Sequence, residues 1–233
     1  MKRLAAGVLA LAAALAPAAA QPPGWQAVKI NDRKKLTVYR LLEEGGRPVV
    51  HARAEGSASG LARAAGFAIA NRPIMTWSWK VSRLIAGADN SQGSKEDSPV
   101  RIVLAFEGDK GSLPKSDQSV MYLARKLSGQ DMPYATLMYV WSNQAPVGTL
   151  IPNPHTRRIQ MVVASSGAAG VGAWQKLSRD VAQDFRRAFQ EEPGRLLTYG
   201  VMSDTDNTGE TVEAWYGEIQ FSTRATRPPN IGP

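Results

Sequence analysis

Oxygen-bearing side chains crowd the segment 202–221, which reads MSDTDNTGETVEAWYGEIQF. Asp204 and Asp206 are separated by one residue and are followed by Gly209, as in the first half of a calcium-binding loop. The twelfth position of such a loop needs a bidentate glutamate, and here it holds Trp215. Because no helix is expected before Asp204 either, an EF-hand is excluded.

Three interpretations of this loop remain open. Asp204, Asp206, the Asn207 amide and Glu210 offer oxygens to a hard cation, in which case Asp204 and Asp206 are the expected calcium ligands. The same groups can also hydrogen-bond to sugar hydroxyls. In the third interpretation the segment is a tight turn, in which Asp and Asn side chains cap backbone amides. No cofactor other than calcium is expected.

Tryptophans form a second group of candidate residues. Trp77 and Trp79, in the segment IMTWSWKV, lie on one face of an expected strand because side chains alternate with period two. Two further apolar residues share that face, which is typical of a hydrophobic core. The alternative is an exposed platform on which a sugar ring stacks. Trp141 and Trp215 carry the same ambiguity.

Charged residues form a third group. Asp97 precedes the strand-like segment VRIVLAF, and Arg101 lies on the face of that strand opposite its large apolar residues. Asp97 is therefore placed to hold Arg101 by a charge-assisted hydrogen bond. The alternative is an ordinary surface ion pair worth under about 1 kcal/mol. Arg101 and Lys80 are the candidate contacts for an anionic group.

The common catalytic templates lack their residues. Two histidines and no cysteine provide too few ligands for a zinc site built on His and Cys. ASSG, near Ser165, lacks the first glycine of a nucleophile elbow, and GAAGVG has the wrong glycine spacing for a dinucleotide fingerprint. No catalytic residue is assigned. A glycan hydrolase would have to pair Asp97 with Asp204 or Asp206 as acid and base.

The N-terminal residues have the pattern of an export signal. Lys2 and Arg3 precede an apolar run, and Ala18 to Ala20 form a small-residue cleavage site. We therefore expect a signal peptide over 1–20, cleavage near Ala20 and a periplasmic or secreted protein. The formal net charge of +8 favours an acidic partner, such as a glycan or an anionic envelope component. Neither a nucleic-acid partner nor a transmembrane anchor is expected.

Short alternating segments separated by Gly, Pro, Asn and Asp predict an all-β fold. With no cysteine, the chain must be stabilised by a hydrophobic core rather than by disulfides. Eight strands are expected, at 36–42, 47–55, 74–81, 100–108, 135–142, 157–165, 195–203 and 211–221, with a hairpin turn at EEGG. Their number and spacing predict a β-sandwich of the jelly-roll type.

Two short peripheral helices interrupt this pattern. Val181, Phe185 and Phe189 recur every fourth residue in SRDVAQDFRRAFQ, which predicts an amphipathic helix. A weaker pattern at 116–127 predicts a second helix. We expect one domain over 21–222 and a disordered tail over 223–233.

Six segments, ASGLAR, WSWKV, EDSPVRI, YVW, RDVAQDFRRAF and SDTDNTG to YGEI, occur in the order seen in a bacterial exported family. Over nearly the whole mature chain the sequence resembles this family, known as domain of unknown function 3047. The resemblance implies secreted, single-domain relatives without an assigned activity and a galactose-binding-like jelly-roll fold. The family pattern falls on Trp77, Trp79, Lys80, Asp97, Arg101, Trp141, Asp180, Asp184, Asp204, Asp206, Asn207 and Gly209. The acidic pair before the arginine reads Glu96-Asp97 here, a departure that keeps the charge.

These observations predict a periplasmic β-sandwich that binds a glycan or another polar, anionic envelope ligand. Trp77 or Trp79 would stack on the ligand, and Arg101 and Lys80 would meet its charge. The expected ligand-binding residues are Trp77, Trp79, Lys80, Asp97, Arg101, Trp141, Asp204, Asp206 and Asn207. The alternatives are a glycan hydrolase or lyase on the same scaffold, and a structural envelope protein.

Overall fold

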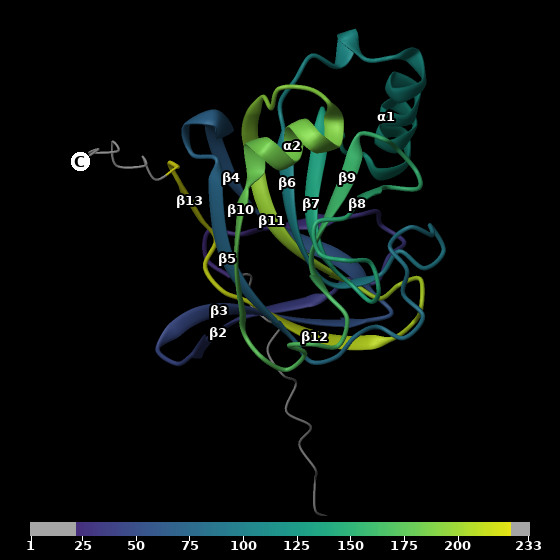
Figure 1. Ribbon diagram of the computed structural model, residues 1–233. Helices are drawn as coiled ribbons and strands as arrows, with labels where there is room; N and C mark the ends of the chain where they lie inside the picture. The colour runs from purple at the N-terminus through teal and green to yellow at the C-terminus, as the bar shows by residue number, and fades with distance from the viewer. Residues whose placement is uncertain (1–21, 225–233) are drawn as a thin grey trace, which may run out of the picture.

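A computed structural model describes residues 22–224, and Figure 1 shows them as two curved β-sheets with two α-helices at the periphery. The predicted all-β sandwich with two short helices is confirmed. The predicted signal peptide, and all of the predicted tail except Thr223 and Arg224, lie outside the described residues. Within 22–224, no helix has the length and apolar character needed to cross a bilayer.

The strands form two sheets whose neighbours are antiparallel, with one exception. The first sheet has the order β1 (Gln26–Lys29), β4 (Ala58–Ala68), β11 (Arg195–Asp204), β6 (Ser98–Phe106), β7 (Ala135–Ser142), β9 (Ile159–Ser166) and β8 (Leu150–Pro152). The second has the order β10 (Gln175–Asp180), β5 (Ile74–Val81), β12 (Thr211–Tyr216), β3 (Arg47–Glu55) and β2 (Val38–Glu44), with β13 (Gln220–Ser222) also paired to β5. The exception is the parallel pair β7 and β9.

The hydrophobic core fills the space between the inner faces of the two sheets. Trp77 and Trp79 on β5 and Trp141 on β7 are almost fully buried there. Trp79 Nε1 donates to Ser165 Oγ over 3.0 Å, and Trp141 Nε1 donates to the Gly167 carbonyl over 3.0 Å. Of the two interpretations of these tryptophans, the core is correct. The prediction that Trp77 or Trp79 stacks on a ligand is wrong, because the opposite sheet covers both rings.

The two helices differ in how closely they pack. Helix α2 (Val181–Phe189) follows Asp180, whose carboxylate accepts from the Gln183 amide over 2.9 Å and caps the helix. It buries Phe185 against the core and covers one end of the sandwich (Figure 1). Helix α1 (Lys115–Ser128) follows the short 3₁₀ turn η2 (Lys110–Ser112) and lies to one side, near β8 and β9. A second 3₁₀ turn, η1 (Ile69–Asn71), joins β4 to β5.

Local alternation predicted most strands but missed β1, β4, β8 and β10. The bounds of β3, β5 and β7 agree with the prediction, and the predicted EEGG turn is made by Gly45 and Gly46 at φ values of 60° and 74°. β4 is rich in alanine and glycine and contains no β-branched residue and a single aromatic one, Phe67. Its close approach to β11 requires glycine on both strands, because a Cβ on Gly60 would lie 2.9 Å from the Val201 carbonyl oxygen and one on Gly200 would lie 2.3 Å from the Leu61 carbonyl oxygen. The predicted strand 211–221 is split into β12 and β13.

Candidate functional site

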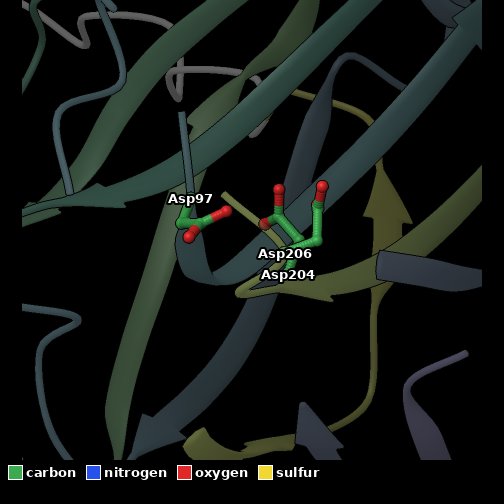
Figure 2. Close-up of side chains that lie close together, drawn as sticks. All are labelled: Asp97, Asp204 and Asp206. Carbon is green, nitrogen blue, oxygen red and sulfur yellow. The ribbon is translucent and has the colours of Figure 1, made fainter. Parts of the chain in front are cut away.

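Three aspartates predicted as site residues lie together where β6 begins and β11 ends. Figure 2 shows Asp97, Asp204 and Asp206 side by side, and one carboxylate oxygen from each lies within 4.8 Å of the others. The strand register explains this arrangement, since Asp204 at the end of β11 pairs with Ser98 at the start of β6. Pairing of the two strands thus joins segments separated by more than a hundred residues.

Asp204 is the ion-pair partner of Arg101. Arg101 Nε donates to Asp204 Oδ1 over 2.9 Å, and Arg101 Nη2 donates to Oδ2 over 3.0 Å. The Ser98 amide donates to the same Oδ1 over 3.1 Å. Burial raises the pKa of Asp204, and Arg101 opposes that rise. The predicted hydrogen bond between Asp97 and Arg101 is therefore wrong, because the carboxylates that accept from Arg101 are those of Asp204 and Glu96, and the surface-pair alternative is wrong because Arg101 is buried.

Arg101 is an interior residue. Its guanidinium contacts Glu96 Oε1 at 3.3 Å, the Glu96 carbonyl oxygen and the sulfur of Met161 at 3.3 Å. Asn153 Nδ2 donates to both oxygens of Glu96 over 3.1 Å. Burial raises the pKa of Glu96, against the lowering effect of Arg101. Arg101 is only 1% exposed, so no ligand reaches it from solvent.

Asp97 caps the loop that follows β11. Its carboxylate accepts from the Asn207 amide over 3.2 Å, from the Thr208 amide over 2.8 Å and from Thr208 Oγ1 over 2.6 Å. This matches the tight-turn interpretation of the loop, with the capping carboxylate supplied by a distant segment rather than by the loop itself. Asn207 contributes its backbone amide to this contact, while the residue itself is exposed.

The negative charges of the three carboxylates in this cluster are already balanced by hydrogen-bond donors and cations of the protein itself. Asp97 and Asp204 each accept three hydrogen bonds, and Asp206 forms an ion pair with Lys34 Nζ. A hard cation needs free carboxylate oxygens and is repelled by nearby ammonium and guanidinium groups. The arrangement therefore fits a structural role better than the predicted calcium site.

An open cavity of about 380 Å³ lies beside Asp206. It is lined by Asn31, Arg33, Lys34, Lys35, Gly56 and Asp206, so three of its six lining residues are cationic. Asn31 Oδ1 accepts from the amides of Arg33 and Lys34 over 2.9 and 3.1 Å and fixes the turn that carries them. The cavity suits an anionic group. The sequence analysis missed these residues, although the NDRKK run is visible in the sequence.

Lys80 lies on the outer face of the second sheet, away from the cluster around Arg101. Because Trp79 points into the core, the next side chain along β5 points outward. The register places His51, Trp215 and Lys80 in one row across β3, β12 and β5. Lys80 Nζ lies 4.4 Å from the centroid of the Trp215 ring, and the Trp215 and His51 rings are 5.1 Å apart.

The β2–β3 hairpin tip closes one side of this row. In a flat sheet, Glu44 and Lys80 are separated by three strand spacings, roughly 14 Å, and by four residues along β2, roughly 13 Å. Lys80 Nζ nevertheless donates to Glu44 Oε1 over 2.6 Å, and Trp174 Nε1 donates to the same oxygen over 3.1 Å. The hairpin tip therefore curls over the outer face. We call Glu44, His51, Lys80, Trp174 and Trp215 the outer-face row.

Two pKa shifts define the charge of the outer-face row. The hydrogen bond from Lys80, with a second from Trp174, lowers the pKa of Glu44, so this carboxylate is ionised at neutral pH. Burial lowers the pKa of His51, against the raising effect of Glu213. His51 is therefore a neutral imidazole at neutral pH, and the row carries one ammonium beside one carboxylate.

The family model described as "Protein of unknown function (DUF3047)" matches residues 23–220. This chain belongs to the DUF3047 family. The predicted resemblance is confirmed over nearly all of the described residues. No curated protein matches the sequence.

Several solved glycan-active proteins are distantly similar to this DUF3047 protein. A family 12 xyloglucanase from Bacillus licheniformis is 8% identical, with 89% of each chain covered and a TM-score of 0.44. Endoglucanase 3 of family GH12 from Trichoderma harzianum is 11% identical, with 84% of this chain and 91% of that one covered and a TM-score of 0.43.

The DUF3047 protein therefore brings together only some of the residues predicted from the sequence. Asp97, Arg101, Asp204, Asp206 and the Asn207 backbone form one connected cluster. The predicted tryptophans Trp77, Trp79 and Trp141 are in the core, and the side chain of Lys80 lies on the outer face of the second sheet. Sequence reasoning missed the roles of His51, Glu44 and Trp174, since no local pattern links these three positions.

Proposed function

We propose that this DUF3047 protein is an exported glycan-binding protein and that the outer-face row is its binding surface. The observation that carries the proposal is the placement of Trp174 and Trp215 outside the core, on either side of Lys80. Lys80 Nζ lies 5.3 Å from the Trp174 ring and 4.4 Å from the Trp215 ring. Indole faces are the surfaces on which sugar rings stack, and their N–H groups need polar partners.

The polar groups of the row suit sugar hydroxyls. Glu44 accepts hydrogen bonds, Lys80 donates them, and the neutral imidazole of His51 can do both. Contacts among these groups hold each side chain in place before a ligand arrives, as in the bond from Trp174 Nε1 to Glu44. A preformed arrangement of this kind lowers the entropic cost of binding.

The cationic cavity favours an acidic glycan. Gly56 lines the cavity and lies five residues along the chain from His51, a distance of roughly 17 Å in an extended strand. Glu55, exposed at the end of β3, pairs with Lys35 of the cavity at 3.4 Å. A chain of several sugars resting on the outer-face row can therefore extend along β3 and place a carboxylate or sulfate near Arg33 and Lys35.

The test is a calorimetric screen of the mature protein against neutral and acidic envelope glycans. Trp215→Ala and Trp174→Ala are each expected to weaken binding about tenfold or more, as for an aromatic anchor. Tyr122→Ala, which removes an exposed aromatic ring from helix α1, is the matched control and should bind like the wild type. Circular dichroism establishes that each variant is folded.

A second pair of variants tests the acidic part of the proposal. Arg33→Ser combined with Lys35→Ser should weaken binding of acidic glycans and leave that of neutral ones unchanged. The proposal is abandoned if the wild type binds no glycan in the screen, or if folded Trp215→Ala binds as tightly as the wild type.

The alternative hydrolase has less support. Asp97 and Asp204 come close enough to act together, but both are buried and their oxygens accept hydrogen bonds from the protein. A general acid and base must reach the substrate. Release of reducing sugar ends from a bound glycan, abolished by Asp97→Asn, would favour the hydrolase. A stable envelope complex recovered by pull-down, without glycan affinity, would favour the structural role.

A further inference from the structure

Helix α1 exposes apolar side chains that a globular protein usually buries. Leu127 is 79% exposed, Leu123 is 59% exposed and Val120 is 36% exposed. Positions separated by three, four and seven residues share one side of a helix, so these three side chains form a continuous stripe. Tyr122, 62% exposed, lies on another side of the helix. Exposed apolar patches of this kind mark sites where a protein contacts another protein or a membrane.

The stripe is exposed to solvent, because α1 is attached to the domain through a neighbouring side. Met121 and Asp117 are buried, and Arg157 Nε donates to both carboxylate oxygens of Asp117 over 3.0 and 2.9 Å. Gln118 Nε2 donates to the Leu113 carbonyl over 2.7 Å and ties the helix to the preceding segment. The helix therefore has an anchored face and, next to it, the exposed apolar stripe.

Exposed lysines lie along one side of the stripe and in the turn before the helix. Lys115 and Lys126 lie along α1, and Lys110 lies in the turn before it. The Nζ atom of Lys126 is 5.5 Å from the Tyr122 ring. Arg125 is paired with Asp131 at 3.4 Å, so the lysines carry the net positive charge of this region. An apolar stripe bordered by cations is complementary to an anionic lipid surface.

The size of the stripe points to the same occupant. The helix has 14 residues, a length of roughly 21 Å, and the stripe contains three aliphatic side chains. Stable protein interfaces bury about 1,200 Å² or more, far above what three side chains supply. A bilayer needs no such area, since an amphipathic helix lying in the interface inserts its apolar side chains only about 5–10 Å deep.

We propose that α1 is a membrane-surface anchor that docks the protein on an anionic bilayer. Val120, Leu123 and Leu127 enter the boundary between head groups and acyl chains, while Lys110, Lys115 and Lys126 contact anionic head groups. Each lysine near such a surface strengthens binding about fivefold. Binding is reversible, because a single short helix carries little apolar surface.

The test is co-sedimentation of the mature protein with vesicles of phosphatidylcholine alone or mixed with phosphatidylglycerol in equal parts. The wild type should bind the mixed vesicles, and high salt should weaken this binding. Leu123→Ser combined with Leu127→Ser should lower the partition coefficient about tenfold. Lys115→Gln combined with Lys126→Gln should lower binding to the mixed vesicles and remove most of its salt dependence.

Leu41→Ser combined with Leu42→Ser is the matched control, because these exposed leucines lie on strand β2, and it should bind like the wild type. The lost side chains are exposed in every variant, so thermal melting should be unchanged. Failure of the wild type to bind mixed vesicles overturns the proposal, as does wild-type binding by the leucine variant. A dimer in light scattering that the leucine variant converts to monomer also overturns it, since a second copy then covers the stripe.

Discussion

Arg101 and Asp204, 103 positions apart in the sequence, form a two-pronged ion pair in the interior of the sandwich. The exposed fractions of the two residues are 1% and 5%. Burial alone would lower the pKa of Arg101, but the charges of Asp204 and Glu96 outweigh burial and raise it. The pair holds the end of β11 against β6. It thereby also positions the loop after β11, which carries Asp206.

Removing one partner of this pair should be strongly destabilising. Arg101→Met leaves the carboxylates of Asp204 and Glu96 buried without their cation, which is expected to lower the free energy of unfolding by about 3–5 kcal/mol. Urea denaturation measures this change. Arg186→Met is the control, because it breaks the exposed pair with Glu192 and should cost under about 1 kcal/mol. Similar losses in the two variants would contradict a structural role for Arg101.

Two neighbouring core tryptophans should respond differently to the same change. Trp79 Nε1 donates to Ser165 Oγ, whereas Trp77 Nε1 is buried without a hydrogen-bond partner among the described residues. Both Trp→Phe variants lose the same volume. Trp79→Phe also loses a hydrogen bond, while Trp77→Phe removes an unsatisfied donor that costs about 1–3 kcal/mol. Thermal unfolding should show Trp79→Phe as the less stable variant, and the opposite order would contradict the assignment.

Acidification should destabilise the protein partly through His51. Burial holds the pKa of His51 below its ordinary value of 6.5, so the unfolded chain binds the proton more readily than the folded one. The stability contributed by His51 is therefore fully present above pH 6.5. It is lost as the pH falls from 6.5 through the lower pKa that His51 has in the folded protein. His51→Gln should lose less melting temperature than the wild type between about pH 7 and about pH 5. Equal losses in the two proteins would show that His51 does not contribute.

Chelation tests the aspartate cluster. The hydrogen bonds to Asp97 and Asp204 and the Lys34 pair with Asp206 already compensate these carboxylates. We therefore expect EDTA and added calcium to leave the melting temperature unchanged. A rise in melting temperature with calcium that is lost in Asp206→Ala would instead establish a calcium site at these residues.

Local periodicity was enough to predict much of the secondary structure. In β3, β5 and β7 the apolar alternation is strong and its ends are marked by turn residues, so the predicted and observed bounds agree. The amphipathic spacing of Val181 and Phe185 likewise predicted α2. β4 could not be predicted in this way, because it has no β-branched residue to give a strand pattern, and its Gly60 is required by close approach to β11, a contact that the local sequence does not show.

The sequence by itself determined which side chains share a face, the basic charge and the loop rich in aspartate and asparagine. Only the tertiary structure decided which face is inside. Period two places Trp77 and Trp79 together and Lys80 opposite them, but burial of the pair depends on the sheet that covers it. The tertiary structure also decided which carboxylate pairs with Arg101 and brought Glu44, Trp174 and Lys80 into contact. Such contacts join strands far apart in the chain, and their pairing and register leave no trace in local spacing.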